Sequence, residues 1–177
     1  TPWTIPGNRA VCYGPSLSYG AYRVDQVRDD MEFDPWTAQG DVIIIADALA
    51  EGIKEAGLVS EWTRISDVTS DMLEGAVLRH PLDGHANGYD FDVPLLSGDH
   101  VTDDAGTGFV HTAPSHGQED YFAWLGHGLP TDLIPHTVGP DGAYTDEAPG
   151  FEGEKVLVTE GKKKGKDGTA NLEAIKA

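Results

Sequence analysis

The chain has 177 residues, of which 39% are hydrophobic and 24% charged, as expected for one globular domain with a buried core. No apolar run approaches the roughly 18–20 residues that span a bilayer. Thr1-Pro2-Trp3 offers neither the basic start of a signal peptide nor an initiating Met. We therefore expect no membrane span, and the missing Met suggests a fragment of a longer polypeptide. The net charge of -18 argues against a dedicated nucleic-acid binder, unless another part of the protein grips the nucleic acid.

The first residues, TPWTIP, contain two prolines and predict a rigid extended segment rather than a helix. Proline lacks the N–H group that the interior of a helix requires. Thr1, Trp3 and Thr4 could line a pocket with hydroxyl groups and an apolar wall. The alternative interpretation is an ordinary edge strand.

Short strands separated by turns are predicted for most of the chain, because 22 glycines and 11 prolines punctuate it. The strand candidates, rich in Val, Ile, Tyr and Leu, are residues 9–13, 18–27, 42–45, 72–78, 93–96 and 108–111. The single cysteine, Cys12, lies in the first of them. It can form no internal disulfide and no thiolate zinc site, and its apolar neighbours indicate a buried thiol rather than a nucleophile.

Two helices are predicted from apolar spacing and from end signals. One covers residues 47–56, where apolar side chains recur every three or four positions. The other covers about 116–127, after Ser115 and Gln118, which have the spacing of an S-x-x-Q capping box. A weaker helix is expected at 170–176.

A Lys- and Gly-rich exposed loop, residues 161–168, precedes that last helix. The predicted elements together indicate a β-rich α+β fold. A closed or nearly closed barrel would hide its many strand edges, with the helices at the periphery.

A polar cluster follows the last predicted strand. His111, His116 and Asp120 form an H-x4-H-x3-D run, and the last two are four residues apart on a helix, as zinc ligands often are. The run matches no strong metal signature, so a metal-free or structural use is favoured. Asp120 could simply stabilise the helix N-terminus, by about 0.3–1 kcal/mol. The sequence shows no Ser-His-Asp order and no nucleophile elbow that would support covalent catalysis.

Several separated motifs occur in an order that resembles the editing (CP1) insertion of isoleucyl-tRNA synthetases, which are class I aminoacyl-tRNA synthetases. The motifs are TPWTIPGNRA at 1–10, GDHVT at 98–102 and GTGFVHTAPSHGQEDY at 106–121. Valine and leucine enzymes share the GTG and the final Asp-Tyr, whereas VHTAPSHG is most similar to the isoleucine branch. The resemblance extends more loosely over nearly the whole chain. Residues 1–177 are therefore expected to be a single editing domain of a larger multidomain synthetase.

The resemblance implies a distorted β-barrel with peripheral helices and hydrolysis of valine from mischarged tRNA(Ile), with valyl-adenylate as a further substrate. Water would be the nucleophile, and neither a metal nor a cofactor is expected in this domain. ATP would be used at the synthetic site of the parent enzyme. The expected partners are the acceptor end of tRNA(Ile) carrying valine and the rest of the synthetase. A monomer in the cytoplasm, with no membrane contact, is expected.

The resemblance also implies roles for individual residues. Asp120 matches the carboxylate that holds the substrate's α-ammonium group, and Thr107 is expected to be catalytic with it. His111 matches the position that closes the side-chain pocket against isoleucine, whereas His116 is expected to be structural. The other substrate-binding candidates are Trp3, which would form an apolar wall, Thr1 and Thr4 beside it, and Asn8, which would contact the terminal adenosine or the ester.

Three other hypotheses remain open at this point. The chain could be a non-catalytic module that binds an amino acid or an adenylate. It could be the editing domain of the related valine or leucine enzymes. It could also be a metal hydrolase that uses His111, His116 and Asp120.

Overall fold

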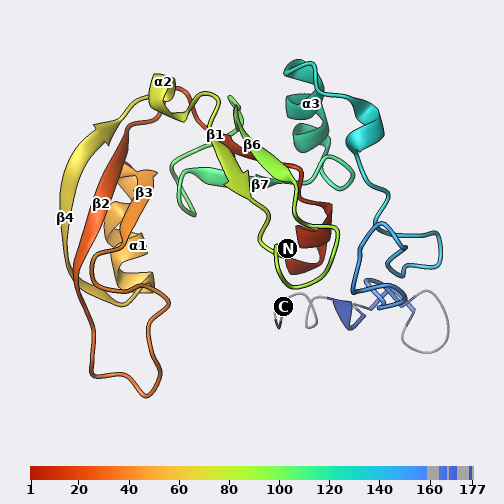
Figure 1. Ribbon diagram of the computed structural model, residues 1–177, viewed down its shortest axis with the longest axis horizontal. Helices are drawn as coiled ribbons and strands as arrows, with labels where there is room; N and C mark the ends of the chain where they lie inside the picture. The colour runs from red at the N-terminus through yellow and green to blue at the C-terminus, as the bar shows by residue number, and fades with distance from the viewer. Residues whose placement is uncertain (159–163, 167, 171–175, 177) are drawn as a thin grey trace. The chain divides into compact units, whose positions relative to one another are not determined.

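The computed structural model describes residues 1–158, 164–166, 168–170 and 176 (Figure 1). Its helices and strands, in chain order, are η1 (Pro2–Gly7), β1 (Ala10–Tyr13), β2 (Tyr19–Val27), β3 (Val42–Ala46), η2 (Asp47–Leu49), α1 (Ala50–Ala56), β4 (Val59–Val68), α2 (Ser70–Leu73), β5 (Val77–Arg79), β6 (Asp92–Ser97), β7 (Phe109–Thr112), α3 (Gln118–Gly126) and η3 (Thr131–Leu133). Elements labelled η are 3-10 helices. Within the described ranges, no helix has both the length and the apolar character needed to cross a membrane.

The strands form two sheets, in the orders β5-β6-β1-β7 and β3-β2-β4, which confirms a β-rich α+β fold. The closed barrel that the sequence suggested is not formed by the described strands, because each sheet keeps two edge strands of its own. The chain divides into two compact units. Unit 1 contains Thr1–Val11, Val77–Leu96 and His111–Ala177, and unit 2 contains Cys12–Ala76 and Ser97–Val110.

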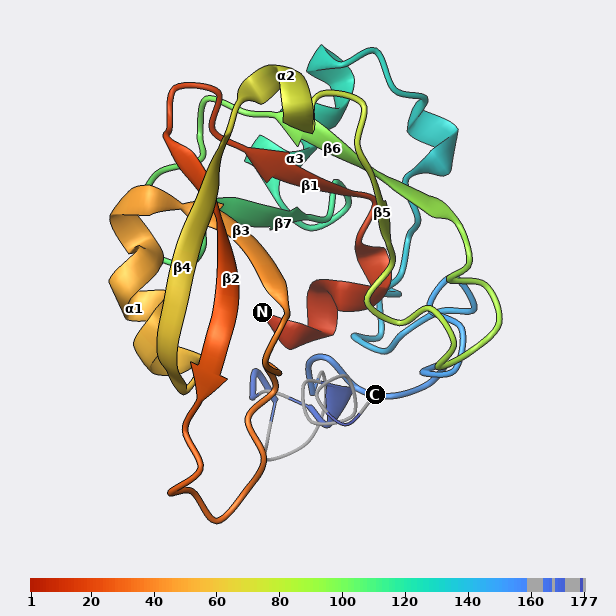
Figure 2. The same ribbon diagram turned by 60° about the vertical axis from the view of Figure 1, so that its left-hand side comes forward.

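Unit 2 is built around the sheet β3-β2-β4, with α1 beside it (Figure 2). Tyr22, Ile45 and Ala50 form a buried cluster that joins the sheet to this helix. β-branched side chains in β3 fit the pleated surface of a strand, which explains why this run was predicted correctly. Cys12 is fully buried, which confirms the prediction of a core thiol.

Unit 1 has its own core, made of Leu82, Tyr89, Tyr144, Ala148, Phe151 and Ala170. Trp3 and Ile5 of η1 pack against this cluster with their partly buried side chains. The core therefore fixes the segment that carries the predicted pocket residues.

The prediction of an extended segment at residues 1–6 is wrong, because these residues lie within or next to the 3-10 helix η1. Pro2 occupies its first turn, where a missing N–H group costs nothing. Pro6 has no N–H group to offer to the carbonyl of Trp3, and the hydroxyl of Tyr144 donates to that carbonyl at 2.6 Å instead. A distant side chain thus makes a proline-rich helix possible.

Two further sequence predictions need correction. The strand expected at 72–78 is split into α2 and β5 by Gly75, whose φ of 76° L side chains rarely adopt. β4 was not predicted at all. Only its end residues, Val59 and Val68, are buried, and its pairing with β2 contains register shifts that remove the regular alternation of apolar and polar residues.

The predicted helices are found with different starts. Residues 47–56 begin as η2 and continue as α1, and the second helix, α3, begins at Gln118 after Gly117. The capping box is wrong, because Gly117 and not Ser115 is the N-cap and no side chain caps the helix. The predicted loop at 161–168 and the helix at 170–176 lie largely outside the described residues.

Candidate functional site

Within unit 1, the site candidates gather where η1 meets the end of β7 and the start of α3. η1 carries Trp3 and Thr4, β7 carries His111, and the first turn of α3 carries Asp120. The core of unit 1 anchors η1 through the Tyr144 hydrogen bond described above. Thr4 and His111 are thus brought together from segments more than a hundred positions apart.

His111 is held by hydrogen bonds on both ring nitrogens. The amide nitrogen of Asn8 donates to the carbonyl of Ala10 at 2.9 Å, which fixes the orientation of that amide. The same amide group lies 2.7 Å from Nδ1 of His111, so Nδ1 must be the acceptor. The proton of the neutral ring is therefore on Nε2, which lies 3.0 Å from the hydroxyl of Thr4.

The chain of bonds continues in the same direction to Thr1. The Thr4 hydroxyl accepts from His111 and donates its own proton to the Thr1 carbonyl at 2.8 Å. Burial lowers the pKa of His111, although the nearby charge of Asp120 partly opposes this shift. His111 is thus a neutral ring with both nitrogens occupied, suited to forming a fixed wall.

Asp120 has one carboxylate oxygen bound and one available. Its Oδ2 accepts the backbone N–H of Ala113 at 2.8 Å, while Oδ1 makes no hydrogen bond with the described residues. The half-buried carboxylate lies so close to Gly117 that any side chain there would meet it at 2.9 Å. Glycine at 117 therefore leaves room for an oriented carboxylate that can accept a hydrogen bond from a cation.

Trp3 is supported from one side by His116. The two rings meet edge to face with centroids 4.8 Å apart, and Nε2 of His116 lies 2.7 Å from the hydroxyl of the fully buried Thr137. Burial lowers the pKa of His116 as well. Gly7 permits this approach, since a Cβ there would lie 3.0 Å from the imidazole. This placement agrees with a structural role for His116, which stays a prediction.

The described residues contain no group of three or more His, Cys, Asp or Glu side chains arranged to hold a metal ion. His111, His116 and Asp120 therefore do not make up such a group, despite their spacing in the sequence. Both histidines instead use ring nitrogens for hydrogen bonds to side chains of unit 1.

Thr107 belongs to unit 2. Its hydroxyl accepts the N–H of Phe109 at 3.2 Å, and its carbonyl accepts the N–H of Ala46 at 2.9 Å. Gly106 and Gly108 on either side have φ values of 76° and 81°, so the GTG motif forms the tight turn that a G-x-G usually marks. The predicted catalytic role of Thr107 stays a prediction.

Asn8 was predicted to touch substrate, and that also stays a prediction. The residue is 1% exposed, and its amide nitrogen donates hydrogen bonds to the carbonyl of Ala10 and to Nδ1 of His111. Sequence reasoning missed two supporting residues, Thr137 and Tyr144. No local pattern marks them, because their contacts with His116 and Trp3 span long stretches of chain.

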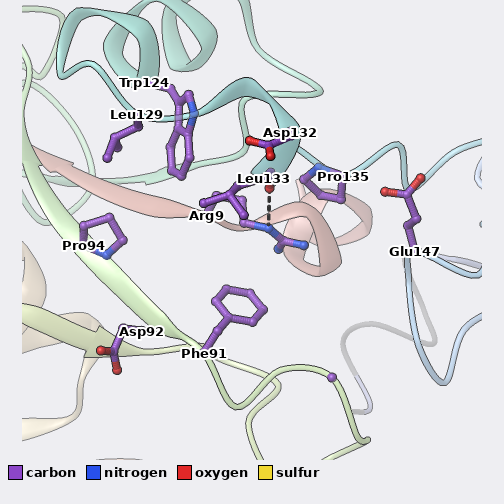
Figure 3. Close-up of a pocket in the computed structure, with 11 residues that line it drawn as sticks. Arg9, Phe91, Asp92, Pro94, Trp124, Leu129, Asp132, Leu133, Pro135 and Glu147 are labelled. Atoms are coloured by element: carbon purple, nitrogen blue, oxygen red, sulfur yellow. Dashed lines mark hydrogen bonds between the residues drawn. The ribbon is translucent and has the colours of Figure 1, made fainter.

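Two surface cavities in unit 1 adjoin these segments. A hollow of about 390 Å³ is lined by Trp3, Val138, Gly139, Pro140, Gly142, Val156 and Leu157. A second cavity, of about 490 Å³, surrounds Arg9 (Figure 3). Arg9 donates to the Leu133 carbonyl at 3.2 Å and lies 4.5 Å from the centre of the Phe91 ring. Trp3 lines the first cavity, whereas His111 and Asp120 line neither of the two, so the role of Trp3 as a wall of the substrate pocket stays a prediction.

No protein-family model matches the chain, but curated sequences and solved structures do. An isoleucine–tRNA ligase of Caulobacter vibrioides is 53% identical over 171 residues, covering 97% of the chain and 17% of that protein. The corresponding ligase of Bradyrhizobium diazoefficiens is 46% identical over 183 residues, covering 100% of the chain and 18% of that protein. The chain thus spans less than a fifth of the length of these relatives.

Solved structures show the same fold. The editing domain of P. falciparum cytosolic leucyl-tRNA synthetase aligns over 99% of the chain and 71% of its own, with a TM-score of 0.56 and 11% identity. The editing domain of P. knowlesi cytosolic leucyl-tRNA synthetase aligns over 98% of this chain and 76% of its own length, with a TM-score of 0.56 and 13% identity. The sequence relatives and the shared fold together show that the chain belongs to the isoleucine–tRNA ligase family, as the segment that forms the editing (CP1) domain.

Proposed function

We propose that this segment hydrolyses valine from mischarged tRNA(Ile), at the site formed by η1, β7 and α3. The observation that carries the proposal is the carboxylate of Asp120, which has one oxygen without a partner among the described residues, close enough to His111 to influence its pKa. An aminoacyl ester carries an ammonium group next to its scissile carbonyl. A charge-assisted hydrogen bond from that ammonium to Asp120 would hold the ester in one orientation.

His111 then acts as the wall that separates valine from isoleucine. Its ring is fixed by Asn8 and Thr4, so it cannot turn aside without breaking a hydrogen bond. A single methylene changes binding by only about 1–3 kcal/mol, and this pair of amino acids is the standard example of that limit. Because the His111 ring is rigid, the extra methylene of isoleucine would overlap with it. Isoleucine would therefore be excluded from hydrolysis.

Water is the proposed nucleophile. The ester is already activated, so the site needs only to orient the ester and the attacking water. Both nitrogens of His111 are occupied, which argues against a role as general base. Trp3 and Thr1 would complete the pocket, and Asn8 would contact the terminal adenosine or the ester. The catalytic role of Thr107, which belongs to the other unit, stays a separate prediction. Neither a metal nor a cofactor takes part in this proposal.

The rest of the synthetase is proposed to bind tRNA(Ile) and deliver its acceptor end, because a net charge of -18 does not favour a phosphate backbone. The parent enzyme would use ATP at a separate synthetic site, in the cytoplasm and as a monomer. A distorted β-barrel with peripheral helices remains part of the proposal on the resemblance alone. Valyl-adenylate is a second proposed substrate of the same site.

The test is deacylation of Val-tRNA(Ile) by the synthetase that contains this segment. Asp120→Ala is expected to lower kcat/KM by roughly 10- to 100-fold, since a hydrogen bond to a charged group is worth about 1.5–3 kcal/mol. Asp120→Asn keeps an acceptor for the Ala113 N–H and should lose nearly as much, because it lacks the charge. Glu119→Ala, on the exposed neighbour, is the control and should change little.

Normal deacylation by both Asp120 variants would contradict the proposal. Binding of a valyl-adenosine analogue at Asp120, with no deacylation by the wild-type synthetase, would instead support the non-catalytic binding module.

A further inference from the structure

The cavity around Arg9 is a feature of unit 1 that the proposed reaction does not use. Its volume of about 490 Å³ lies within the range of roughly 300–1,000 Å³ that is typical of small-ligand sites. Neither His111 nor Asp120 lines it. Its apolar lining includes Phe91, Pro94, Trp124 and Leu129 (Figure 3). The cavity is therefore a second place in unit 1 with the size and lining of a ligand site.

Arg9 brings a guanidinium group into this cavity with part of its hydrogen-bonding capacity unused. Nε donates to the Leu133 carbonyl at 3.2 Å, and Nη1 donates to the carbonyls of Pro6 and Asn8 at 3.4 and 2.7 Å. Nη2 donates no hydrogen bond to the described residues, and Arg9 forms no ion pair with them. The guanidinium is held in place, 4.5 Å from the centre of the Phe91 ring. Its remaining N–H groups thus suit a carboxylate, which is planar like the guanidinium itself.

Three exposed carboxylates line the same cavity without pairing with Arg9, namely those of Asp92, Asp132 and Glu147. Glu147 is oriented, because its Oε2 accepts the backbone N–H of His136 at 3.0 Å. Its Oε1 makes no hydrogen bond within the described ranges. Burial lowers the pKa of Arg9, and nearby charge, including that of Glu147, partly opposes this shift. The cavity thus combines a cation that has unused donors with an oriented carboxylate that has an unused oxygen.

This combination of charges disfavours simple ions as ligands. A free anion would reach Arg9 only against the repulsion of three carboxylates, and a free cation would be repelled by Arg9 itself. A zwitterion satisfies both groups at once. An α-amino acid carries its carboxylate and its ammonium group on the same carbon atom, so one molecule can meet both partners.

The apolar part of the cavity indicates what kind of side chain such an amino acid would have. In Figure 3, Trp124, Leu129 and Pro94 lie to one side of Arg9 and Glu147 to the other. The Trp124 ring is buried and fixed, because its Nε1 donates to the Pro130 carbonyl at 2.9 Å. A fixed indole is a good surface for an aromatic or branched side chain.

We propose that this cavity binds a free amino acid with a large apolar side chain. Arg9 holds the carboxylate, Glu147 holds the ammonium group, and Trp124 and Leu129 pack against the side chain. This second site goes beyond the proposed deacylation and does not depend on it.

The first test uses ligands that differ by one group and leaves the protein unaltered. Equilibrium dialysis of radiolabelled L-phenylalanine against the synthetase that contains this segment should give a Kd of about 1 mM or below. Phenethylamine lacks the carboxylate, 3-phenylpropanoate lacks the ammonium group, and L-alanine lacks the large side chain. Each should compete at least roughly tenfold more weakly than unlabelled L-phenylalanine, since each loses a charge-assisted hydrogen bond or the apolar contact.

The second test locates the binding in this cavity. Glu147→Gln keeps an acceptor for the His136 N–H and removes only the charge, so it should fold normally and raise the Kd at least roughly tenfold. Arg9→Lys keeps the charge but not the planar pair of donors and should also weaken binding several-fold. Asp146→Asn, on the exposed neighbour of Glu147 outside the cavity, is the control and should leave the Kd unchanged.

Binding at any other site of the synthetase would survive in Glu147→Gln, so an unchanged Kd in that variant would overturn the proposal. Competition by phenethylamine or 3-phenylpropanoate as strong as that of L-phenylalanine would also overturn it, because one charge alone would then suffice. The same holds if L-phenylalanine does not bind at concentrations up to about 20 mM. The assay contains no tRNA, so its failure is distinguishable from a failure of the proposed deacylation.

Discussion

The candidate site and the sheet β3-β2-β4 use their polar side chains in different ways. In the site, Asn8, His111 and Thr4 are joined by hydrogen bonds that run in one direction and occupy both nitrogens of the imidazole. In the sheet, Arg64 pairs with Asp67 at the surface, where their side chains are 36% and 82% exposed. Water and salt screen such pairs, so they contribute little to stability. The site therefore depends on individual side chains, and the sheet on backbone pairing and tight turns.

The largest expected effect is at the GTG turn of unit 2. In Gly108→Ala the new Cβ would lie 2.5 Å from the Cβ of Ala46, at a φ of 81° that L side chains rarely adopt. Left-handed backbone costs about 1–2 kcal/mol, and overpacking adds about 1–3 kcal/mol. We expect the free energy of unfolding, measured by urea denaturation, to fall by about 3 kcal/mol.

Gly106→Ala is the matched control for this turn. Gly106 has a similar φ of 76°, but a Cβ there would meet nothing within 4 Å. Its cost should be only about 1–2 kcal/mol, from backbone strain alone. Equal losses in the two variants would show that close packing against Ala46 does not limit residue 108.

The second prediction concerns the wall of the site. His111→Ala removes the ring held by Asn8 and Thr4 and opens space for the extra methylene of isoleucine. The ratio of deacylation rates for Val-tRNA(Ile) over Ile-tRNA(Ile) should fall about tenfold, within the range of about 1–3 kcal/mol that a methylene contributes. His127→Ala, at the exposed end of α3, should leave the ratio unchanged. An unaltered ratio in His111→Ala would remove size exclusion from the proposal.

The difference between local sequence patterns and long-range side-chain contacts also explains how much of the fold the sequence could predict. The helix at 47–56 was predicted from its apolar spacing, and β2 and β3 were predicted from runs rich in Val, Ile and Tyr. β4 was missed, since its middle is largely exposed and its pairing with β2 is irregular. η1 was predicted as extended, because the hydroxyl that stabilises it belongs to Tyr144, 141 positions away.

Prediction of the site depended on resemblance more than on local physics. The H-x4-H-x3-D run pointed to His111, His116 and Asp120 and left a metal open. Nothing near His111 in the sequence indicates Asn8, which lies 103 positions away and determines its tautomer. Long-range hydrogen bonds leave no periodic trace, so such partners could be assigned only from the structure.

The smallest expected effect comes from one chemical change made in both units. Tyr144→Phe removes the hydroxyl that donates to the Trp3 carbonyl at 2.6 Å, and Tyr22→Phe removes the one that donates to Asp47 at 2.7 Å. Asp47 keeps two hydrogen bonds from Arg64, so Tyr22→Phe should lower the free energy of unfolding by less than about 1 kcal/mol. Tyr144→Phe should cost about 1–1.5 kcal/mol, because Pro6 has no N–H group that could replace the lost donor.

The two tyrosine variants also separate stability from activity. Tyr144→Phe should loosen η1, and with it Trp3 and Thr4, so deacylation of Val-tRNA(Ile) should slow several-fold while the Tyr22→Phe enzyme keeps its rate. Urea denaturation and single-turnover deacylation of the same preparations measure both quantities. A Tyr22→Phe enzyme impaired as strongly as Tyr144→Phe would show that the sheet, too, depends on individual polar side chains, and the distinction between the two regions would fail.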